Sequence, residues 1–476
     1  MIKSFKIYFF FFLFSFIFSY EALISPIAYS IYHSEGNSYK YDKTYTSIGG
    51  WGLLLKYKNK NLTIKSDFYN NRIYNIMDKP NFFNDNQGLS RFKKVDYNSN
   101  EIISTFDFDI SNLNINYNHN NLDLYLGKFN THWGYGNSSL TISNKSPSFP
   151  KLGFNLKINE NINFEYFHGS LKSNILDTAI KDYYVHDIPF GNRSPNLNRF
   201  IAAHRLIIEV NPKLNISLNE LVIYGVRNLD IHYCLPFLPF WSLQGYLGDL
   251  DNIVISMDFN YNLNEQKSIY GSLLIDEIRP SEIFSENNRN WFGYQLGVNF
   301  KNIIFNDDNL ISELNWTDHR IYRHRFDINN HYNHGYPVGF WGGPHSEEIY
   351  LNYSFKKFDF LFNIEYSNAK RGILTDMMLD NQYIDENEQF TRYDDGYEKL
   401  SNLEISINKH IYKGVVAKIG INLIDWNNAG FDTSGLNNEN LTNIKKESLF
   451  FGLSYNYDFE KEESFIHKDS FKYILK

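Results

Sequence analysis

The stretch Phe451-Gly452-Leu453-Ser454-Tyr455-Asn456-Tyr457-Asp458-Phe459 alternates large apolar residues with small or polar ones. Alternate side chains of a β-strand point to opposite faces, so this stretch predicts a strand with one apolar and one polar face. Residues 122–127 and 214–219 show the same alternation. When such stretches recur along almost the whole chain, they are typical of a membrane β-barrel, in which only every second residue meets lipid.

The overall composition fits a barrel better than a helical membrane protein. The chain has 476 residues, of which 18% are aromatic, and its mean hydropathy is −0.43. A membrane-spanning helix needs about 20 consecutive apolar residues, and the sequence beyond the N-terminus has no such stretch. The net charge is −8 without a basic patch, so we expect no nucleic-acid partner. Cys234 is the only cysteine, which excludes an intrachain disulfide.

The N-terminus predicts export. Residues 1–6 carry two lysines, and residues 7–18 form an apolar run that is too short to span a membrane as a helix. This arrangement is typical of a signal peptide. We expect a signal peptide within residues 1–30, cleaved after Ser19 or after Ser30, with an uncleaved anchor as the alternative. The expected location is the cell outer membrane.

The rest of the chain predicts a single all-β domain. We expect a transmembrane antiparallel up-and-down β-barrel over residues 31–459, with about 16–18 strands. A soluble β-sandwich is the alternative, since strand patterns alone do not prove closure. The charged tail 460–476 either lies in the periplasm or contains part of the closing strand. The expected strands are 47–57, 61–69, 102–110, 122–129, 151–158, 161–169, 200–210, 214–225, 252–261, 267–275, 291–300, 310–320, 347–355, 358–367, 401–409, 414–424 and 447–459.

One run resembles a family signature. Residues 126–150, LGKFNTHWGYGNSSLTISNKSPSFP, resemble a stretch of the Wzi-type capsule-assembly outer-membrane proteins. The resemblance extends over roughly residues 120–350. Further matching residues follow in the expected order at 203–205, 219–220, 224–225, 236, 239, 244, 251–252, 258, 270, 274–276, 293–297, 334–339 and 343–346.

The resemblance implies a lectin-like barrel that holds capsular or related surface polysaccharide at the outer membrane. The implied partners are therefore this polysaccharide and outer-membrane lipid, and other envelope-assembly proteins stay open as partners. The characterised enterobacterial form also has a periplasmic helical bundle at its N-terminus. Residues 31–60 show no helical pattern, so this chain is more similar to barrel-only relatives. A channel for sugars or anionic solutes is the alternative function.

Sugar binding requires flat aromatic faces and planar polar groups that pair with hydroxyls. Charged residues on the strands should face the lumen, because a basic residue facing lipid at the midplane costs about 2–4 kcal/mol. The alternatives are a loop that only fills the barrel and an ion-pair network that only braces it. The candidate polysaccharide-binding residues are His132, Trp133, Tyr135, Asn137, Asn144, Arg205, Glu220, Asp251, Asn252, Asp276 and Trp341.

The sequence does not favour an enzyme. Asp276 and Glu277 are adjacent on an expected strand and so face opposite ways, which is incompatible with the facing carboxylates of a glycosidase. Histidines gather between His319 and His345, but no cysteine or firm carboxylate set accompanies them as in a zinc site. We therefore expect no catalytic residues, no metal and no cofactor.

Overall fold

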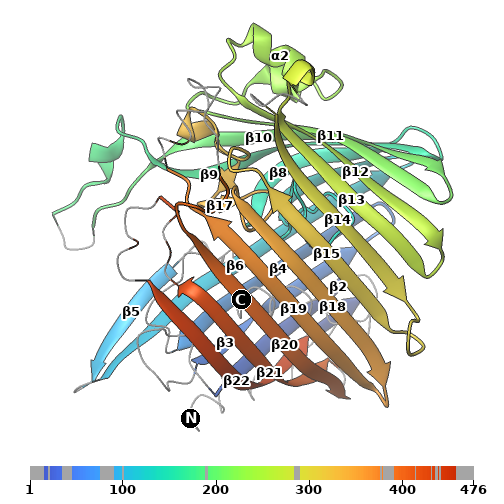
Figure 1. Ribbon diagram of the computed structural model, residues 1–476, viewed down its shortest axis with the longest axis vertical. Coiled ribbons are helices and arrows are strands. Elements are labelled where there is room, and N and C mark those ends of the chain that lie inside the picture. The colour runs from blue at the N-terminus through green and yellow to red at the C-terminus, as the bar shows by residue number, and fades with distance from the viewer. Residues whose placement is uncertain are drawn as a thin grey trace.

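The protein is described by a computed structural model in which a single sheet dominates (Figure 1). The described residues are 16–19, 22–34, 46–74, 91–98, 101–187, 191–282, 290–375, 378, 391–412, 414–429, 431, 433–434, 438 and 441–456. The expected tail 460–476 lies outside them.

The sheet closes into an antiparallel barrel of 18 strands, as expected. The wall strands of the first half are β2 (Ala22–His33), β3 (Thr46–Lys58), β4 (Leu62–Tyr74), β6 (Glu101–His119), β7 (Leu122–Phe129), β8 (Phe149–Lys157), β9 (Ile162–Leu176), β10 (Asn196–Asn211) and β11 (Leu214–Gly225). Those of the second half are β12 (Asn252–Asn264), β13 (Lys267–Glu277), β14 (Trp291–Lys301), β15 (Asn309–Thr317), β18 (Ser346–Lys357), β19 (Phe360–Gly372), β20 (Tyr397–Tyr412), β21 (Val415–Ala429) and β22 (Thr442–Asn456).

Strand β2 closes the barrel. Ala28 at its centre lies opposite Trp51 of β3 on one side and opposite Tyr455 of β22 on the other. Full closure leaves no unpaired strand edge in the wall, which is the condition for a sheet in hydrocarbon. The soluble sandwich is therefore not the fold of this chain.

The start of the barrel bears on the expected signal peptide. The wall begins at Ala22 rather than at residue 31, because Ala22–His33 pairs with β3 along its whole length and Ile27–His33 also pairs with β22. Cleavage after Ser30 would remove most of this strand, whereas cleavage after Ser19 leaves it whole. Cleavage itself stays a prediction, and we now favour the position after Ser19.

The remaining elements lie outside the wall ladder. These are β1 (Phe16–Ser19), which pairs with β2; β5 (Arg91–Asn98), which pairs with β6; the hairpin of β16 (Tyr332–Asn333) and β17 (Tyr336–Pro337); the 3-10 helices η2 (Lys181–Tyr184), η3 (Ile231–Cys234), η4 (Pro280–Glu282) and η5 (Asp327–Asn329); and the helix α2 (Phe240–Tyr246). Among the described residues, no helix is long and apolar enough to cross a membrane.

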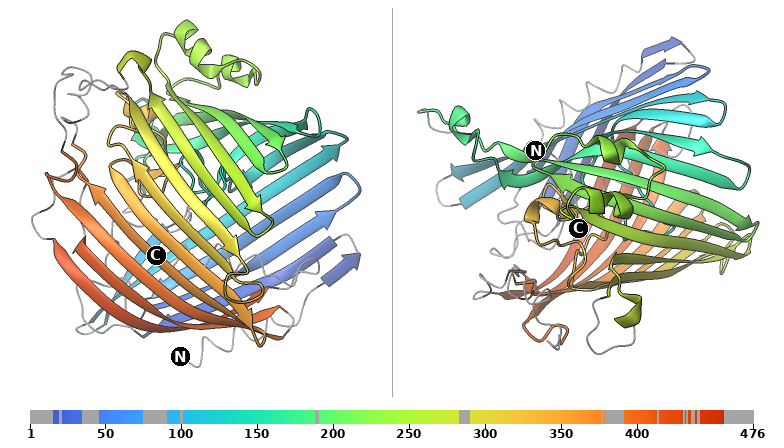
Figure 2. Two further views of the ribbon diagram at one scale, coloured as in Figure 1. Left: turned by 45° about the vertical axis from the view of Figure 1, so that its right-hand side comes forward. Right: turned by 90° about the horizontal axis from the view of Figure 1, so that it is seen from above.

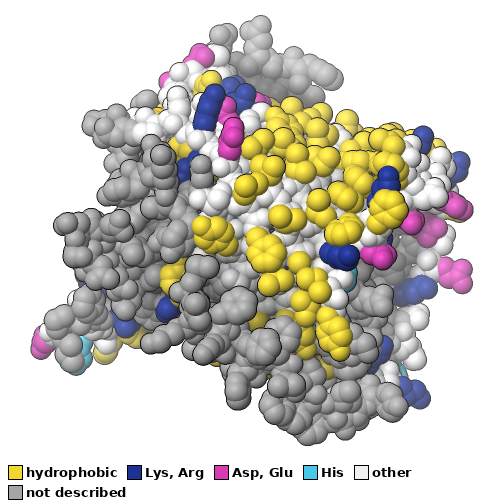
Figure 3. All heavy atoms as spheres, turned by 90° about the horizontal axis from the view of Figure 1, so that it is seen from below, with side chains coloured by type: hydrophobic (Ala, Val, Ile, Leu, Met, Phe, Trp, Pro, Cys, Tyr) yellow, Lys and Arg dark blue, Asp and Glu magenta, His cyan; other side chains and the backbone are white. Residues whose placement is uncertain are grey.

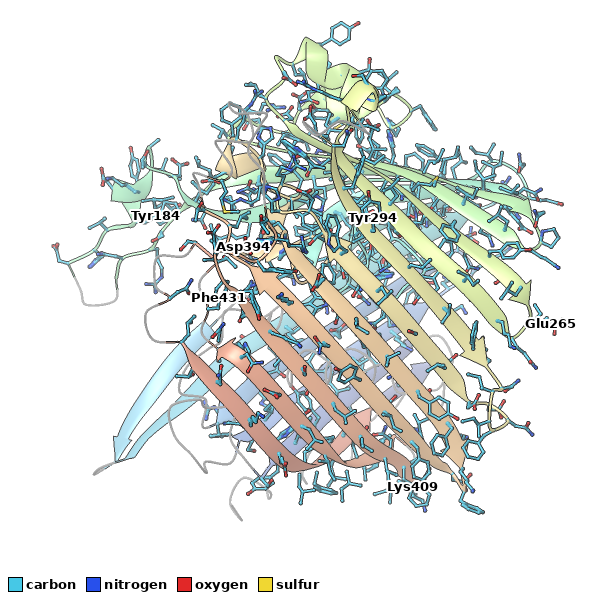
Figure 4. The ribbon with its side chains drawn as sticks, in the orientation of Figure 1. Tyr184, Glu265, Tyr294, Asp394, Lys409 and Phe431 are labelled. Carbon is cyan, nitrogen blue, oxygen red and sulfur yellow. The ribbon has the colours of Figure 1, made fainter. Side chains whose placement is uncertain are left out.

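Short and long connections alternate around the barrel (Figures 1 and 2). The short ones include the turn at Phe358 and Asp359, whose φ angles of 50° and 60° match the tight hairpin turns that suit twisted strands. The long connections, at 130–148, 177–195, 226–251, 278–290, 318–345 and 373–396, share the opposite end. In Figure 4, Glu265 marks the short-turn end, and Tyr184 and Asp394 lie towards the long-loop end. This asymmetry is characteristic of outer-membrane barrels.

The outer face of the wall is apolar. On β14, Tyr294 and Leu296 are exposed, whereas Gln295 between them is buried. The same alternation runs through the neighbouring strands, with Leu314 exposed on β15 and Leu351 on β18. Figure 3 shows the resulting field of apolar side chains, with most charged side chains at its margins. This belt is the surface that meets lipid.

Every expected strand overlaps a wall strand of the structure. The wall strand that has no counterpart among the expected ones is β2, because its apolar run Ala22–Ile31 continues the apolar start of the chain. Sequence alternation is hard to see where both faces carry apolar side chains. Its inward residues Ile27, Tyr29 and Ile31 join a lumenal apolar cluster, so the middle of the inner face of β2 is apolar, with the polar residues Ser25 and His33 on either side.

Candidate functional site

The loop that joins β7 to β8, residues 130–148, is folded into the lumen. Its backbone and side chains contact residues of β12, β14, β15 and β18, which lie around the wall. Trp133 also packs against Phe167 of β9, with ring centroids 5.5 Å apart. A loop can touch so many strands of a closed sheet only from the inside. We call residues 130–148 the plug loop.

Small and polar residues let the plug loop fold back on itself. Gly134 has a φ of +122°, which side-chain-bearing residues rarely adopt. Trp133 and Ile142 form an isolated β-bridge, and the Ser139 hydroxyl donates to the Trp133 carbonyl across the turn. Trp133, Leu140 and Ile142 are thereby buried in the largest apolar cluster. The loop is thus a packed structural unit.

A buried carboxylate of the wall holds the tip of the plug loop. Glu313, which is fully buried at the centre of β15, accepts hydrogen bonds from the backbone N–H groups of Asn137 and Ser138 at 2.7 and 3.0 Å. It also accepts from Tyr270 and Asn315. A Cβ atom at Gly136 would lie only 2.3 Å from the Glu313 carboxylate, so glycine is required for this approach.

Lys145 of the plug loop is linked to a second wall carboxylate, that of Glu348, through the Ser138 hydroxyl. The Lys145 ammonium donates to the Ser138 hydroxyl at 2.9 Å, and that hydroxyl lies 3.5 Å from Glu348 of β18. Glu348 also accepts from Ser367 and from the Trp341 indole, at 2.7 and 2.9 Å. Charges in the lumen are therefore compensated by hydrogen bonds and by one another, as buried charges must be.

A second long loop, residues 318–345, covers the plug loop on the long-loop side. The Tyr322 hydroxyl donates to the Leu140 carbonyl at 2.5 Å, and Asn333 donates to the Pro147 carbonyl at 2.9 Å. The His331 Nε2–H donates to the Thr141 carbonyl at 3.0 Å, and burial lowers the pKa of His331 to about 4. The two loops therefore form one body across the lumen. We call residues 318–345 the cover loop.

Tyr135 is the plug-loop residue with the most open side chain. It is 38% exposed although the loop lies inside the barrel, so solvent-accessible space adjoins its ring. Beside it, Arg205 of β10 pairs with Glu165 of β9 at 2.6 Å, and the Arg205 guanidinium lies 5.0 Å above the Trp133 ring. His132 lies close to the Gly136 backbone and the Asn144 side chain, and burial lowers the pKa of His132 to about 4.

The inner wall between the plug loop and the short turns is rich in asparagine. Side chains on this face have neighbours from both adjoining strands, as in the pair Asn352–Asn363, whose amides are hydrogen-bonded at 3.0 Å. These asparagines are half-buried, as expected beside a hydrated lumen. They are Asn112, Asn114, Asn116, Asn155, Asn163, Asn215, Asn260, Asn299, Asn309, Asn352, Asn363 and Asn408. Each amide offers donors and an acceptor without net charge.

The structure gathers some of the predicted site residues and separates others. His132, Trp133, Tyr135, Asn137 and Asn144 share the plug loop, and Arg205 faces them. Trp133 is fully buried, so its ring has no face open to a ligand. Its part in the site is to pack the loop.

Three further candidates tie the loops to the wall. Asp276 of β13 accepts the Tyr322 N–H at 2.9 Å. The pairing with β14 shifts register between Ile275 and Glu277, so the regular alternation that put Asp276 and Glu277 on opposite faces ends here, and Glu277 is exposed. Asn252 donates to the Asn329 carbonyl of the cover loop at 2.9 Å. Trp341 is bound to Glu348 through its indole, as described above. All three lie on the lumenal side.

The expectation that strand charges face the lumen was wrong for Glu220. Glu220 of β11 points outward, between Leu218 and Val222, whereas Leu221 belongs to the lumenal cluster. Asp251 is also outside the lumen, in the connection 226–251, where it pairs with Arg227. The cost of an outward charge is avoided because backbone N–H groups of this connection hydrogen-bond the Glu220 carboxylate.

Sequence reasoning placed Glu313 among the strand charges expected to face the lumen, but it did not find that Glu313 holds the plug loop, and it did not single out the asparagine lining. Glu313 sits on an alternating strand, and only the contact with a loop about 175 residues away reveals its role. The asparagines did leave a signal, since they recur at alternate positions, as in Asn112, Asn114 and Asn116. Among the described residues, no group of histidine, cysteine and acidic side chains could hold a metal ion.

Comparison with known proteins supports the fold. No protein-family model and no curated protein matches the chain. Among solved structures it is similar to Escherichia coli Wzi, described as an outer-membrane protein involved in group 1 capsule assembly and as a carbohydrate-binding β-barrel. The TM-score is 0.55 at 12% identity, over 91% of this chain and 85% of that one.

Two other similarities have lower TM-scores. OccAB2 of Acinetobacter baumannii has a TM-score of 0.46 at 9% identity, covering 92% of this chain and 98% of that one. OccK3 of Pseudomonas aeruginosa has a TM-score of 0.46 at 10% identity, covering 91% and 95%. Scores below 0.5 carry no argument about this chain. The similarity to Wzi confirms, for the fold, the resemblance seen in residues 126–150, and the chain is an outer-membrane-type β-barrel.

Proposed function

We propose that this protein binds surface polysaccharide without chemical change and retains it at the outer membrane. The observation that carries the proposal is the position of the plug loop. The segment whose sequence resembles the Wzi-type family is the one that fills the lumen and presents Tyr135 there. A solved structure with the same fold is described as a carbohydrate-binding barrel, which supports the same reading.

The chemistry of the lumen suits a neutral, hydrated polymer. Tyr135 offers a flat ring to the C–H face of a sugar, and the asparagine amides offer paired donors and acceptors to hydroxyls. The Arg205–Glu165 pair is only partly exposed and neutral as a whole. Each contact is weak, but a polymer sums many of them along its length.

The alternative function, a channel for anionic solutes, is less well supported by the lining. An anion path needs an excess of basic side chains. Lumenal bases are instead held by neighbouring groups: Lys418 and Arg371 pair with Glu404 and Glu398 at 2.6 and 2.5 Å, and Arg199 is bound to backbone carbonyls of the cover loop. The plug and cover loops also occupy the passage, with a shared apolar cluster between them.

The test is a binding measurement with surface polysaccharide purified from the bacterium that makes the protein. Tyr135→Ala should weaken binding by roughly 2- to 10-fold, as for an aromatic contact of about 0.5–1.5 kcal/mol. Tyr135→Phe keeps the ring and should bind almost as the wild type does. In a deletion strain, polysaccharide should move from the cell-bound to the shed fraction.

The controls separate binding from folding. Tyr183→Ala, on an exposed connection outside the lumen, should leave both readouts unchanged. The proposal fails if the purified wild type binds no polysaccharide and its deletion leaves the cell-bound fraction intact.

A further inference from the structure

The connection between β11 and β12, residues 226–251, folds onto the outside of the barrel wall. Tyr224 and Val222 of β11 point outward and are fully buried beneath it, whereas Ile223 between them joins the lumenal cluster. Tyr233, Phe240 and Leu243 of the connection complete this outer apolar core. Figure 1 shows α2 next to β10 and β11. We call residues 226–251 the strap.

Polar contacts fix the strap to the wall. The Glu220 carboxylate accepts the backbone N–H groups of Phe240 and Trp241 at 2.8 and 2.7 Å, and His204 lies 2.9 Å from it. The Tyr166 hydroxyl of β9 donates to the Tyr233 carbonyl at 2.9 Å. These contacts explain why an acidic side chain is tolerated on the outer face of β11.

Ion pairs lie at the two ends of the strap. Arg227 at its start is bound through two nitrogens to Asp251 at its end, at 2.8 and 2.6 Å, and also to Asp230. Between them, residues 231–247 contain no aspartate, glutamate, lysine or arginine. The Arg227–Asp251 ion pair therefore joins the two ends of the strap, and the residues between them carry no acidic or basic side chain other than Asp230, His232 and Asp249.

The surface of the strap that faces away from the wall is apolar. Its large side chains are 43–83% exposed, which is unfavourable for a patch of this kind in water. They are Ile231, Leu235, Phe237, Leu238, Trp241 and Tyr246. Trp and Tyr are the residues that membrane proteins place at the boundary between hydrocarbon and headgroups.

The strap surface is continuous with the lipid-facing belt. Phe237 stacks on Phe164 of β9 at 4.8 Å, on the outer face of the wall. Phe164 is paired in register with Leu206, which is paired with Leu218, and Leu218 is 48% exposed in the belt. The body of the strap therefore reaches the same part of the wall that lipid covers.

We propose that the strap is a membrane-contact element that lies in the outer leaflet and packs its exposed apolar side chains against lipid acyl chains. Its partner is thus lipid hydrocarbon. The inference is independent of polysaccharide binding, because the strap lies outside the lumen. On the side of the strap, the wall has an additional apolar layer. Contact of this layer with lipid would fix the depth and the tilt of the barrel in the membrane.

The experiment uses spin labels on the full-length protein in lipid nanodiscs of phosphatidylethanolamine and phosphatidylglycerol. Cys234 is first replaced by serine, and single cysteines are then introduced as Phe237→Cys and Trp241→Cys. Leu296→Cys in the belt serves as the lipid control, and Glu265→Cys in a short turn as the water control. Collisions with oxygen and with a water-soluble nickel chelate are measured.

Labels at positions 237 and 241 should behave like the label at 296, with high oxygen and low nickel accessibility. Values like those at position 265 would overturn the proposal, since the strap would then lie in water. Low accessibility to both reagents, together with a dimer in sedimentation, would also overturn it, because a second copy would cover the surface. If one variant does not fold, the other, or Leu238→Cys, gives the same reading.

Discussion

At the scale of single residues, two neighbouring aromatic side chains of the plug loop have different roles. Trp133 is fully buried among apolar residues and lies under the Arg205 guanidinium. Tyr135, two positions on, is 38% exposed to the lumen. The sequence presents them as equivalent candidates for stacking on sugar. Their environments assign packing to Trp133 and leave contact with a ligand to Tyr135.

The difference predicts that the two alanine substitutions reduce stability by different amounts. Trp133→Ala should lower the free energy of unfolding by about 3–5 kcal/mol, because it leaves a cavity in the apolar cluster. Tyr135→Ala should lower it by less than about 1 kcal/mol, as is usual for exposed positions. Urea unfolding followed by tryptophan fluorescence would measure both. Equal losses would contradict the assignment.

At the scale of elements, the plug and cover loops stabilise each other across the lumen. Ser143 donates its N–H to the Val338 carbonyl at 2.7 Å, beside the His331–Thr141 contact. Neither loop has regular secondary structure to hold it in place, apart from the short β16–β17 hairpin and η5. Their order depends on hydrogen bonds to each other and to inward side chains such as Glu313 and Asp276.

This dependence predicts a loss of stability in acid that involves His331. Burial lowers the pKa of His331 to about 4 in the folded protein, below the ordinary value of 6.5, so the unfolded chain binds the proton first. The contribution of His331 to stability is present above pH 6.5 and decreases as the pH falls from 6.5 towards 4. The urea midpoint should therefore fall over this range.

His331→Gln is the matched variant, since its amide can still donate to the Thr141 carbonyl but does not titrate. The fall of its urea midpoint between pH 7 and pH 4.5 should be smaller than in the wild type. An identical fall in both proteins would assign the acid sensitivity to other groups, such as His319 and His345, whose pKa values burial also lowers to about 4.

At the scale of the whole molecule, the barrel combines a filled upper half with a neutral, asparagine-lined lower half. Barrels of this size have a lumen wide enough for an aqueous passage unless loops occupy it. Here the plug and cover loops do so, through an apolar cluster that includes Leu140, Tyr322 and Phe340. One half of the lumen is therefore occupied by packed loops, and the other half has a polar wall.

This architecture predicts low conductance for the intact protein in planar bilayers. Replacing residues 132–147 by a short Gly-Ser linker should raise the conductance, because the plug loop is removed from the lumen. The opened barrel should favour cations, since removal of the loop takes away Lys145 and leaves the Glu313 and Glu348 carboxylates facing the passage. The reversal potential in a salt gradient should therefore shift in the direction of a cation-selective pore. A difference in gel migration between unheated and boiled samples checks that the variant is folded. A wide, anion-selective pore in the wild type would favour the channel function.

The fold class and most of the wall could be predicted from the sequence, because alternation with a period of two is a local property of each strand. It also marked residues 126–150 as the segment to examine. Strand β2 was missed, since most of its inner side chains are apolar and the alternation is weak there. The outward direction of Glu220 was missed because backbone N–H groups about 20 residues further on bind its carboxylate, and the alternation along β11 gives no sign of that contact.

The paths of the long connections are visible only in the folded molecule. The same kind of aromatic and glycine-containing sequence forms the plug loop inside the barrel and the strap outside it. Which side a loop takes depends on its contacts: Glu313, about 175 residues away, holds the plug loop, and Glu220, about 20 residues away, holds the strap. These contacts join groups that folding brings together, so no local pattern of residues encodes them.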